Sequence, residues 1–137
     1  MTDPAIRFTV SLPRPLLTEL DARITGRGYA SRSELVRDLI RKEMTADRWR
    51  AGTEPMVGVL SIVYDHHRRG LVDRLHAIQH DRYVHVLCTQ HVHVDHHTCL
   101  ETIVLRGRPE QIEQLALEIG GQKGVQQAEL VRMGVAA

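Results

Sequence analysis

The feature that most constrains this chain is a short segment near its N-terminus that has the pattern of a strand but no neighbour to pair with. Residues 6–12, IRFTVSL, alternate strictly between apolar and polar side chains, as a half-buried strand does. The segments that follow, residues 15–28 and 31–44, have the apolar spacing of helices instead. A single strand leaves its backbone N–H and C=O groups without partners. The sequence therefore predicts pairing with a second copy of the chain, as a two-stranded antiparallel ribbon packed on four helices.

The polar face of this ribbon predicts contact with DNA. It carries Arg7, Thr9 and Ser11 from each copy. Arginine and small hydroxyl side chains on a ribbon can read base edges in a major groove. The formal net charge of the whole chain is only +1, so the signal for nucleic acid is local rather than global. In the second helix, Ser31 and Glu34 have the spacing of a capping box.

The rest of the chain predicts a second domain. Residues 51–55 are interpreted as a linker between a DNA-binding domain, residues 1–50, and a domain over residues 56–137. The second domain shows two β-α-β units, which predict an α+β fold with a ferredoxin-like layer of four strands under two helices. No apolar run approaches the roughly 20 residues of a membrane span, and no signal-peptide core is present. With two cysteines, these features favour a cytoplasmic protein with reduced thiols.

Histidine is distributed unevenly, because all nine histidines lie between His66 and His97. In the predicted strand from Val84 to Val94, even positions are mainly apolar and are assigned to the core face. His91 and His93 then emerge together on the opposite, exposed face, where they could bind one metal ion. Cys88 is assigned to the core as a buried small hydrophobic side chain.

A second cysteine can complete a metal site if the strand register allows it. Cys99 opposes His93 when the connection is the five residues 94–98, whereas a four-residue connection sends the thiol toward the core. Two imidazoles and a thiolate would suit tetrahedral zinc, or planar Ni(II) or Cu(II). A fourth ligand is needed, and spacing alone leaves seven candidates: His66, His67, His76, His80, His85, His96 and His97.

Several stretches together resemble one known family, the nickel-responsive regulators (NikR), which are ribbon-helix-helix repressors with an ACT-like metal domain. The resemblance is carried by RFTVSL, GYASRSELVRDLIR, VLSIVYDHHRRGL, AIQH and HVHVDHHTCLE. It implies that His91, His93 and Cys99 bind Ni²⁺ in planar four-coordinate geometry. It also implies that His80, at the end of AIQH, completes the site from a neighbouring subunit of a homotetramer.

The resemblance further implies the DNA-binding and secondary sites. Arg7, Thr9 and Ser11 match the positions that read DNA, although Ser11 stands where a threonine is familiar. The remaining matches are a basic loop pair, Arg68 and Arg69, and a weaker second cation site, Glu34 and Asp38. The implied partner is a palindromic operator bound by a dimer of dimers. Another member has several histidines after His80, whereas this chain has Asp81, Arg82 and Tyr83, which disfavours secondary metal binding there.

Two functions other than a nickel-responsive repressor could use the same histidines and cysteine. A metalloenzyme or redox protein would need an open coordination position, which a complete ligand set does not leave. A ribbon-helix-helix regulator that responds to an amino acid or peptide would not need a window rich in histidine. The sequence therefore favours a repressor that is not an enzyme, with metal binding linked to operator binding.

Overall fold

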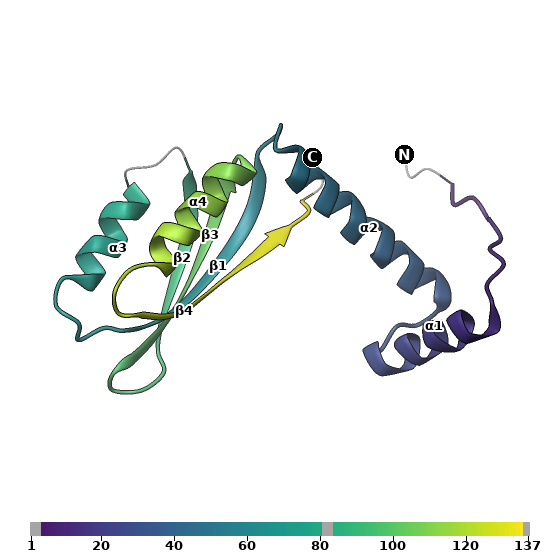
Figure 1. The fold of residues 1–137 in the computed structure, drawn as a ribbon, viewed down its shortest axis with the longest axis horizontal. Helices are drawn as coiled ribbons and strands as arrows, with labels where there is room; N and C mark the ends of the chain where they lie inside the picture. Colours follow the sequence, from purple (N-terminus) through teal and green to yellow (C-terminus); the bar gives the residue numbers. More distant parts are fainter. Residues whose placement is uncertain (1–3, 81–83, 136–137) are drawn as a thin grey trace. The chain divides into compact units, whose positions relative to one another are not determined.

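The computed structural model describes residues 4–80 and 84–135, and the chain divides into two compact units, Met1–Ile40 and Arg41–Ala137 (Figure 1). The division falls inside a long helix, so this helix contributes residues to both units. Among the described residues, no helix is both long enough and apolar enough to cross a membrane.

The N-terminal unit contains helix α1, Arg14–Arg27, and the first part of helix α2, Arg32–Ala51. Helix α1 ends at Gly28, whose φ of 71° is left-handed and whose N–H donates to the carbonyl of Ile24. The start of α2 is capped as predicted, because the N–H of Glu34 donates to Ser31 Oγ at 3.2 Å. Both helices are joined by a double hydrogen bond from Arg32 to Asp21, with each contact at 2.8 Å.

The segment predicted to form the N-terminal strand pairs with no other strand in the part of the chain that the structure describes. Residues 4–13 form neither a helix nor a strand. The apolar side chains assigned to the buried face are instead open to solvent: Ile6 is 89% exposed, Phe8 69% and Val10 60%. A strand needs a second strand for its hydrogen bonds, and the one predicted here belongs to another copy. Formation of the ribbon therefore stays a prediction.

The C-terminal unit is built on a four-stranded antiparallel sheet with the order β2-β3-β1-β4. Its elements, in chain order, are β1 Met56–Asp65, α3 Leu71–His80, β2 His85–His93, β3 Thr98–Gly107, α4 Pro109–Gly120 and β4 Val125–Met133. Helices α3 and α4 lie beside each other over the sheet (Figure 1). The predicted ferredoxin-like arrangement, and with it the α+β fold class, is confirmed.

The helices bury one face of the sheet, which we call the covered face. Strand β1 alternates between buried and half-buried residues, as expected for a sheet with helices on one side. The core joins the helices to the covered face through Leu71, Leu75, Ile112, Leu115, Ile119, Leu60, Ile62, Ile103 and Leu105. The opposite face, called the open face, is also apolar but carries exposed side chains such as Val92, Val131 and Met133.

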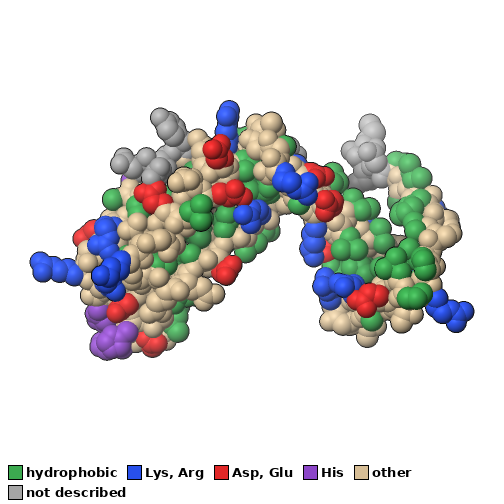
Figure 2. Space-filling model, viewed as in Figure 1, with side chains coloured by type: hydrophobic (Ala, Val, Ile, Leu, Met, Phe, Trp, Pro, Cys, Tyr) green, Lys and Arg blue, Asp and Glu red, His purple; other side chains and the backbone are tan. Residues whose placement is uncertain are grey.

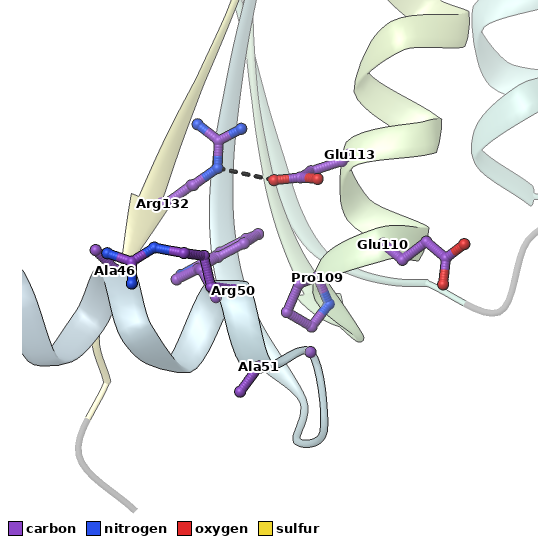
Figure 3. A pocket seen from close by; sticks show the side chains of 9 residues that line it. Ala46, Arg50, Ala51, Pro109, Glu110, Glu113 and Arg132 are labelled. Atoms are coloured by element: carbon purple, nitrogen blue, oxygen red, sulfur yellow. Dashed lines mark hydrogen bonds and ion pairs between the residues drawn. The ribbon is translucent and has the colours of Figure 1, made fainter.

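The C-terminal end of α2 belongs to this second unit. The Trp49 side chain is only 6% exposed, its Nε1–H donates to the carbonyl of Met133 at 3.2 Å, and the guanidinium of Arg132 lies 5.8 Å from its ring. A cavity of about 630 Å³ adjoins it, where the end of α2 meets the start of α4 (Figure 3). Arg132 pairs with Glu113 across this cavity at 2.9 Å. Helix α2 therefore runs into the region interpreted as the beginning of a linker.

Candidate metal centre

Three strand ends meet at one corner of the C-terminal unit, and histidine side chains gather there (Figure 2). His93 pairs with Cys99, so the register that the metal hypothesis required is confirmed. The connection is held by Asp95, whose Oδ1 accepts hydrogen bonds from the N–H groups of His97 and Thr98, both at 2.8 Å. These two bonds lower the pKa of the Asp95 carboxyl, because they stabilise its charged form.

The thiol of Cys99 lies at the centre of a group of imidazoles. It is fully buried, and its Sγ lies 3.2 Å from His91 Nε2, 3.3 Å from His93 Nδ1 and 3.3 Å from His66 Nδ1. Ligand atoms of Cys99, His66 and His93 all lie within 4.8 Å of one another. We call these four residues the Cys99 cluster.

The face on which the cluster lies was predicted wrongly, because strand β2 contains a β-bulge. Val86 pairs with Leu105 and Cys88 pairs with Val104, so Leu87 is the extra residue. An extra residue reverses the side-chain alternation beyond it. His91 and His93 therefore lie on the covered face beside the core. For the same reason Cys88, expected to be buried, is exposed.

Burial and nearby charge determine the protonation of the cluster thiol. Burial, followed by the negative charges of Glu101, Asp65 and Asp95, raises the pKa of Cys99 above its ordinary value of 9.0. Burial is also the main cause that lowers the pKa of His66, and the neighbouring His67 and His93 add to it. In the metal-free chain these shifts favour the protonated thiol of Cys99 and the neutral imidazole of His66.

Behind the cluster lies a buried hydrogen-bonded pair. Tyr64 Oη donates to Glu101 Oε2 at 2.9 Å, and Glu101 is only 3% exposed. The same tyrosine oxygen lies 3.3 Å from His91 Nδ1. Burial and the carboxylate of Glu101 raise the pKa of Tyr64 far above its ordinary value, so the hydroxyl keeps its proton.

His80, the fourth predicted ligand, lies elsewhere in the chain. It is the last residue of α3 and is exposed. It lines a cavity of about 440 Å³ together with His76, Gln79, Val84, Val86, Thr89 and Glu101. Within residues 4–80 and 84–135, the ligand atoms that all lie within 4.8 Å of one another belong to His66, His93 and Cys99, and not to His80. His91 is also outside this group, but its Nε2 lies 3.2 Å from Cys99 Sγ. The single chain therefore brings together three of the four predicted ligands.

The residues predicted to bind DNA are accessible in their own units. Arg7, Thr9 and Ser11 are exposed on the segment that precedes α1. Arg68 and Arg69 are exposed in the turn between β1 and α3.

The residues expected at the second cation site have protein partners. Glu34 pairs with Arg37 at 2.6 Å, and Asp38 accepts a hydrogen bond from the hydroxyl of Tyr29. A cation bound by Glu34 and Asp38 would compete with these two contacts.

Three residues of this site were not singled out from the sequence. His66 was only one of seven candidates for a fourth ligand, and Tyr64 and Glu101 were assigned no role at the site. A register argument could have found Tyr64 and Glu101, because Tyr64 on β1 pairs with Cys99 on β3, and Glu101 on β3 pairs with His91 on β2. That argument requires knowing which strands are neighbours.

Solved structures support the fold of the C-terminal unit. The ACT domain of a GTP pyrophosphokinase from Chlorobium tepidum aligns with 56% of this chain and 99% of its own, with a TM-score of 0.50 and 10% identity. An uncharacterised protein of Thermotoga maritima aligns with 59% of this chain and all of its own, with a TM-score of 0.51 and 19% identity. Fold and site thus define a protein with an ACT-like domain and a cluster of one buried thiol and three imidazoles that could hold a metal ion.

Sequence comparisons identify the family. Residues 57–133 match the NikR C-terminal nickel-binding domain, and residues 6–46 match the ribbon-helix-helix proteins of the copG family. Nickel-responsive regulators, as their names describe them, match with 50% identity in Campylobacter concisus, over 97% of both chains, and 52% in Helicobacter pylori strain P12, over 95% of this chain and 90% of the relative. The chain belongs to the family of nickel-responsive, ribbon-helix-helix transcriptional regulators.

Proposed function

We propose that this nickel-responsive regulator binds Ni²⁺ through His91, His93 and Cys99 of one subunit and His80 of a partner subunit. The observation that carries the proposal is the buried thiol of Cys99, with ring nitrogens of His91 and His93 at 3.2 and 3.3 Å. A nitrogen and a sulfur bound to one ion at about 2.0 and 2.3 Å lie roughly 3.1 Å apart at a right angle and roughly 3.5 Å apart at a tetrahedral angle. Each of these two spacings therefore suits a nitrogen and a sulfur bound to one metal ion.

The position of His80 supports a shared site. In its own chain this histidine lies at the end of α3, outside the group of ligand atoms around Cys99. A second subunit that places the end of its α3 over the cluster would supply His80 as the third nitrogen ligand beside His91 and His93, in place of His66. Three nitrogens and a thiolate in a plane suit Ni(II), and Cu(II) would also accept them.

The open face of the sheet supports assembly into a homotetramer. Its exposed apolar side chains include Val92, Val131 and Met133. Contiguous apolar surface of this kind is characteristic of an interface. We propose that this face packs against the same face of a second copy, so that two ribbon dimers are joined through their metal domains.

DNA binding by this family member is assigned to the paired N-terminal segments. Arg7, Thr9 and Ser11 of each ribbon would read one half-site of a palindromic operator. Arg68 and Arg69 would add phosphate contacts. We also propose Glu34 and Asp38 as a weaker cation site, supported by two carboxylates one helical turn apart. The two free cysteine thiols of the chain fit a cytoplasmic location.

Nickel controls DNA binding through linkage. An ion that is bound by two subunits stabilises the arrangement of the tetramer in which those subunits meet. If that arrangement also presents both ribbons to the operator, nickel raises DNA affinity, and DNA must raise nickel affinity by the same factor. No chemical turnover is involved, because protein ligands fill the planar coordination positions.

A nickel titration followed by absorption, run beside a DNA mobility assay, tests this function. We expect one Ni²⁺ per chain, a thiolate-to-nickel band and nickel-dependent retardation of an operator fragment. Cys99→Ala should abolish the band and the retardation. Cys88→Ala is the matched control and should retain both, because that thiol is exposed on the other face of β2. Retention of the band in Cys99→Ala would refute the proposed site.

A further inference from the structure

The buried carboxylate of Glu101 has no part in the ligand set proposed above. Its side chain is 3% exposed, and it is the one charged residue in the core of the described residues. A buried carboxylate is costly unless hydrogen bonds stabilise its charge. Tyr64 supplies one of these bonds at 2.9 Å, and Tyr64 is itself fully buried. Both side chains lie behind the metal centre, on strands next to the ligands.

The geometry connects this pair to one ligand in particular. Tyr64 Oη lies 3.3 Å from His91 Nδ1, and Glu101 Oε2 lies 3.8 Å from the same nitrogen. The other ring nitrogen, His91 Nε2, lies 3.2 Å from Cys99 Sγ. The imidazole of His91 therefore has one nitrogen directed to the metal centre and the other directed to the buried pair.

The direction of the hydrogen bonds follows from the number of protons available. Tyr64 has a single hydroxyl proton, which it donates to Glu101, so its oxygen can only accept from His91. His91 must then carry its own proton on Nδ1, which leaves the lone pair of Nε2 free for a metal ion. A metal-ligating histidine commonly donates its second N–H to a carboxylate or another acceptor, which fixes both its tautomer and its orientation.

We propose that Tyr64 and Glu101 are positioning residues that set the tautomer of His91, with Tyr64 transmitting the effect of the buried carboxylate to the imidazole. The inference rests on the proposed function of His91 as a nickel ligand. Glu101 acts as the final acceptor of a chain of hydrogen bonds from His91 through Tyr64. The chain makes Nε2 the ligating atom before any metal arrives, and so reduces the cost of ordering the site.

Nitrogen NMR of histidine side chains in the metal-free, full-length protein tests this proposal, at a mildly alkaline pH where ordinary imidazoles are neutral. His91 should be protonated on Nδ1 in the unmodified protein, with its resonances assigned from a His91→Asn variant. Tyr64→Phe keeps the ring but removes the hydroxyl, and should shift His91 toward the Nε2–H tautomer. It should also weaken nickel binding by about 10- to 100-fold.

Tyr29→Phe is the matched control, because it removes another tyrosine hydroxyl that donates to a carboxylate, that of Asp38. It should leave unchanged the tautomer of His91 and the nickel affinity of the Cys99 cluster, which is followed through the thiolate band. His91 protonated on Nε2 in the unmodified protein would overturn the inference, whether or not Tyr64→Phe folds. An unchanged tautomer in a folded Tyr64→Phe would overturn it as well. Failure of the proposed function itself is tested separately: a thiolate-to-nickel band that survives in His91→Ala would show that His91 is not a nickel ligand.

Discussion

Nickel should displace one proton from Cys99 as it binds, so its affinity should rise steeply with pH. Burial and three nearby carboxylates raise the pKa of this thiol above 9.0. The metal-free protein therefore holds a thiol across the neutral range, whereas the ligand must be a thiolate. Below the thiol pKa, each pH unit should then raise the nickel association constant about tenfold, or about 1.4 kcal/mol.

Competition with a chelator of known proton affinity measures this slope. Between pH 7 and 8.5 we expect roughly a thirtyfold gain in affinity. Calorimetry in two buffers with different ionisation enthalpies should give about one proton released per ion. Cys88→Ala should keep both values, since that thiol is exposed and lies on the opposite face of β2. A flat profile with no proton released would mean that Cys99 is already a thiolate, and would refute the electrostatic reasoning.

Three further predictions concern DNA binding, packing and assembly. Arg7→Ala should cost roughly 1–3 kcal/mol at the operator and much less on random DNA in a mobility assay, and an equal loss on both would make Arg7 a phosphate contact. Gly58→Ala should destabilise the C-terminal unit by about 1–3 kcal/mol in urea unfolding, because its new methyl group would lie 3.0–3.1 Å from neighbouring side chains. Gly107→Ala should cost clearly less, because the nearest atom to its new methyl group lies 3.4 Å away. Val131→Glu on the open face should dissociate the proposed tetramer in sedimentation experiments, and a variant that still forms a tetramer would place the interface elsewhere.

The sequence predicted the order of the elements well, because their periodicities are strong and their boundaries are marked. Pro109 opens α4, Gly28 closes α1, and Ser31 caps α2, each at a position where the local chemistry favours it. Local rules were sufficient for these features. The register at Cys99 could be narrowed in advance to two pairings, one for a four-residue and one for a five-residue connection, and the structure has the five-residue one.

The face of the metal centre could not be predicted by the same rules. Strand β2 has apolar or small residues on both sides of Leu87, so nothing in the alternation marks the position of the bulge. The bulge reverses the face on which every later side chain of β2 lies. Because of this one extra residue, His91 lies on the covered face and not on the exposed face that the alternation predicts. Contacts of Tyr64 and Glu101 were equally inaccessible, because they depend on β1 and β3 being neighbours.

The central claim is that one nickel site is shared between subunits, and a complementation experiment tests it most directly. His80→Ala chains keep the cluster but supply no fourth ligand, and Cys99→Ala chains supply His80 but lack the thiolate. When the two are unfolded, mixed equally and refolded, random assembly should give about a quarter of sites with a complete ligand set. Those sites should show the planar thiolate–nickel spectrum that neither parent shows. A mixture whose spectrum equals the sum of its parents, while its subunits demonstrably exchange, would contradict the shared site.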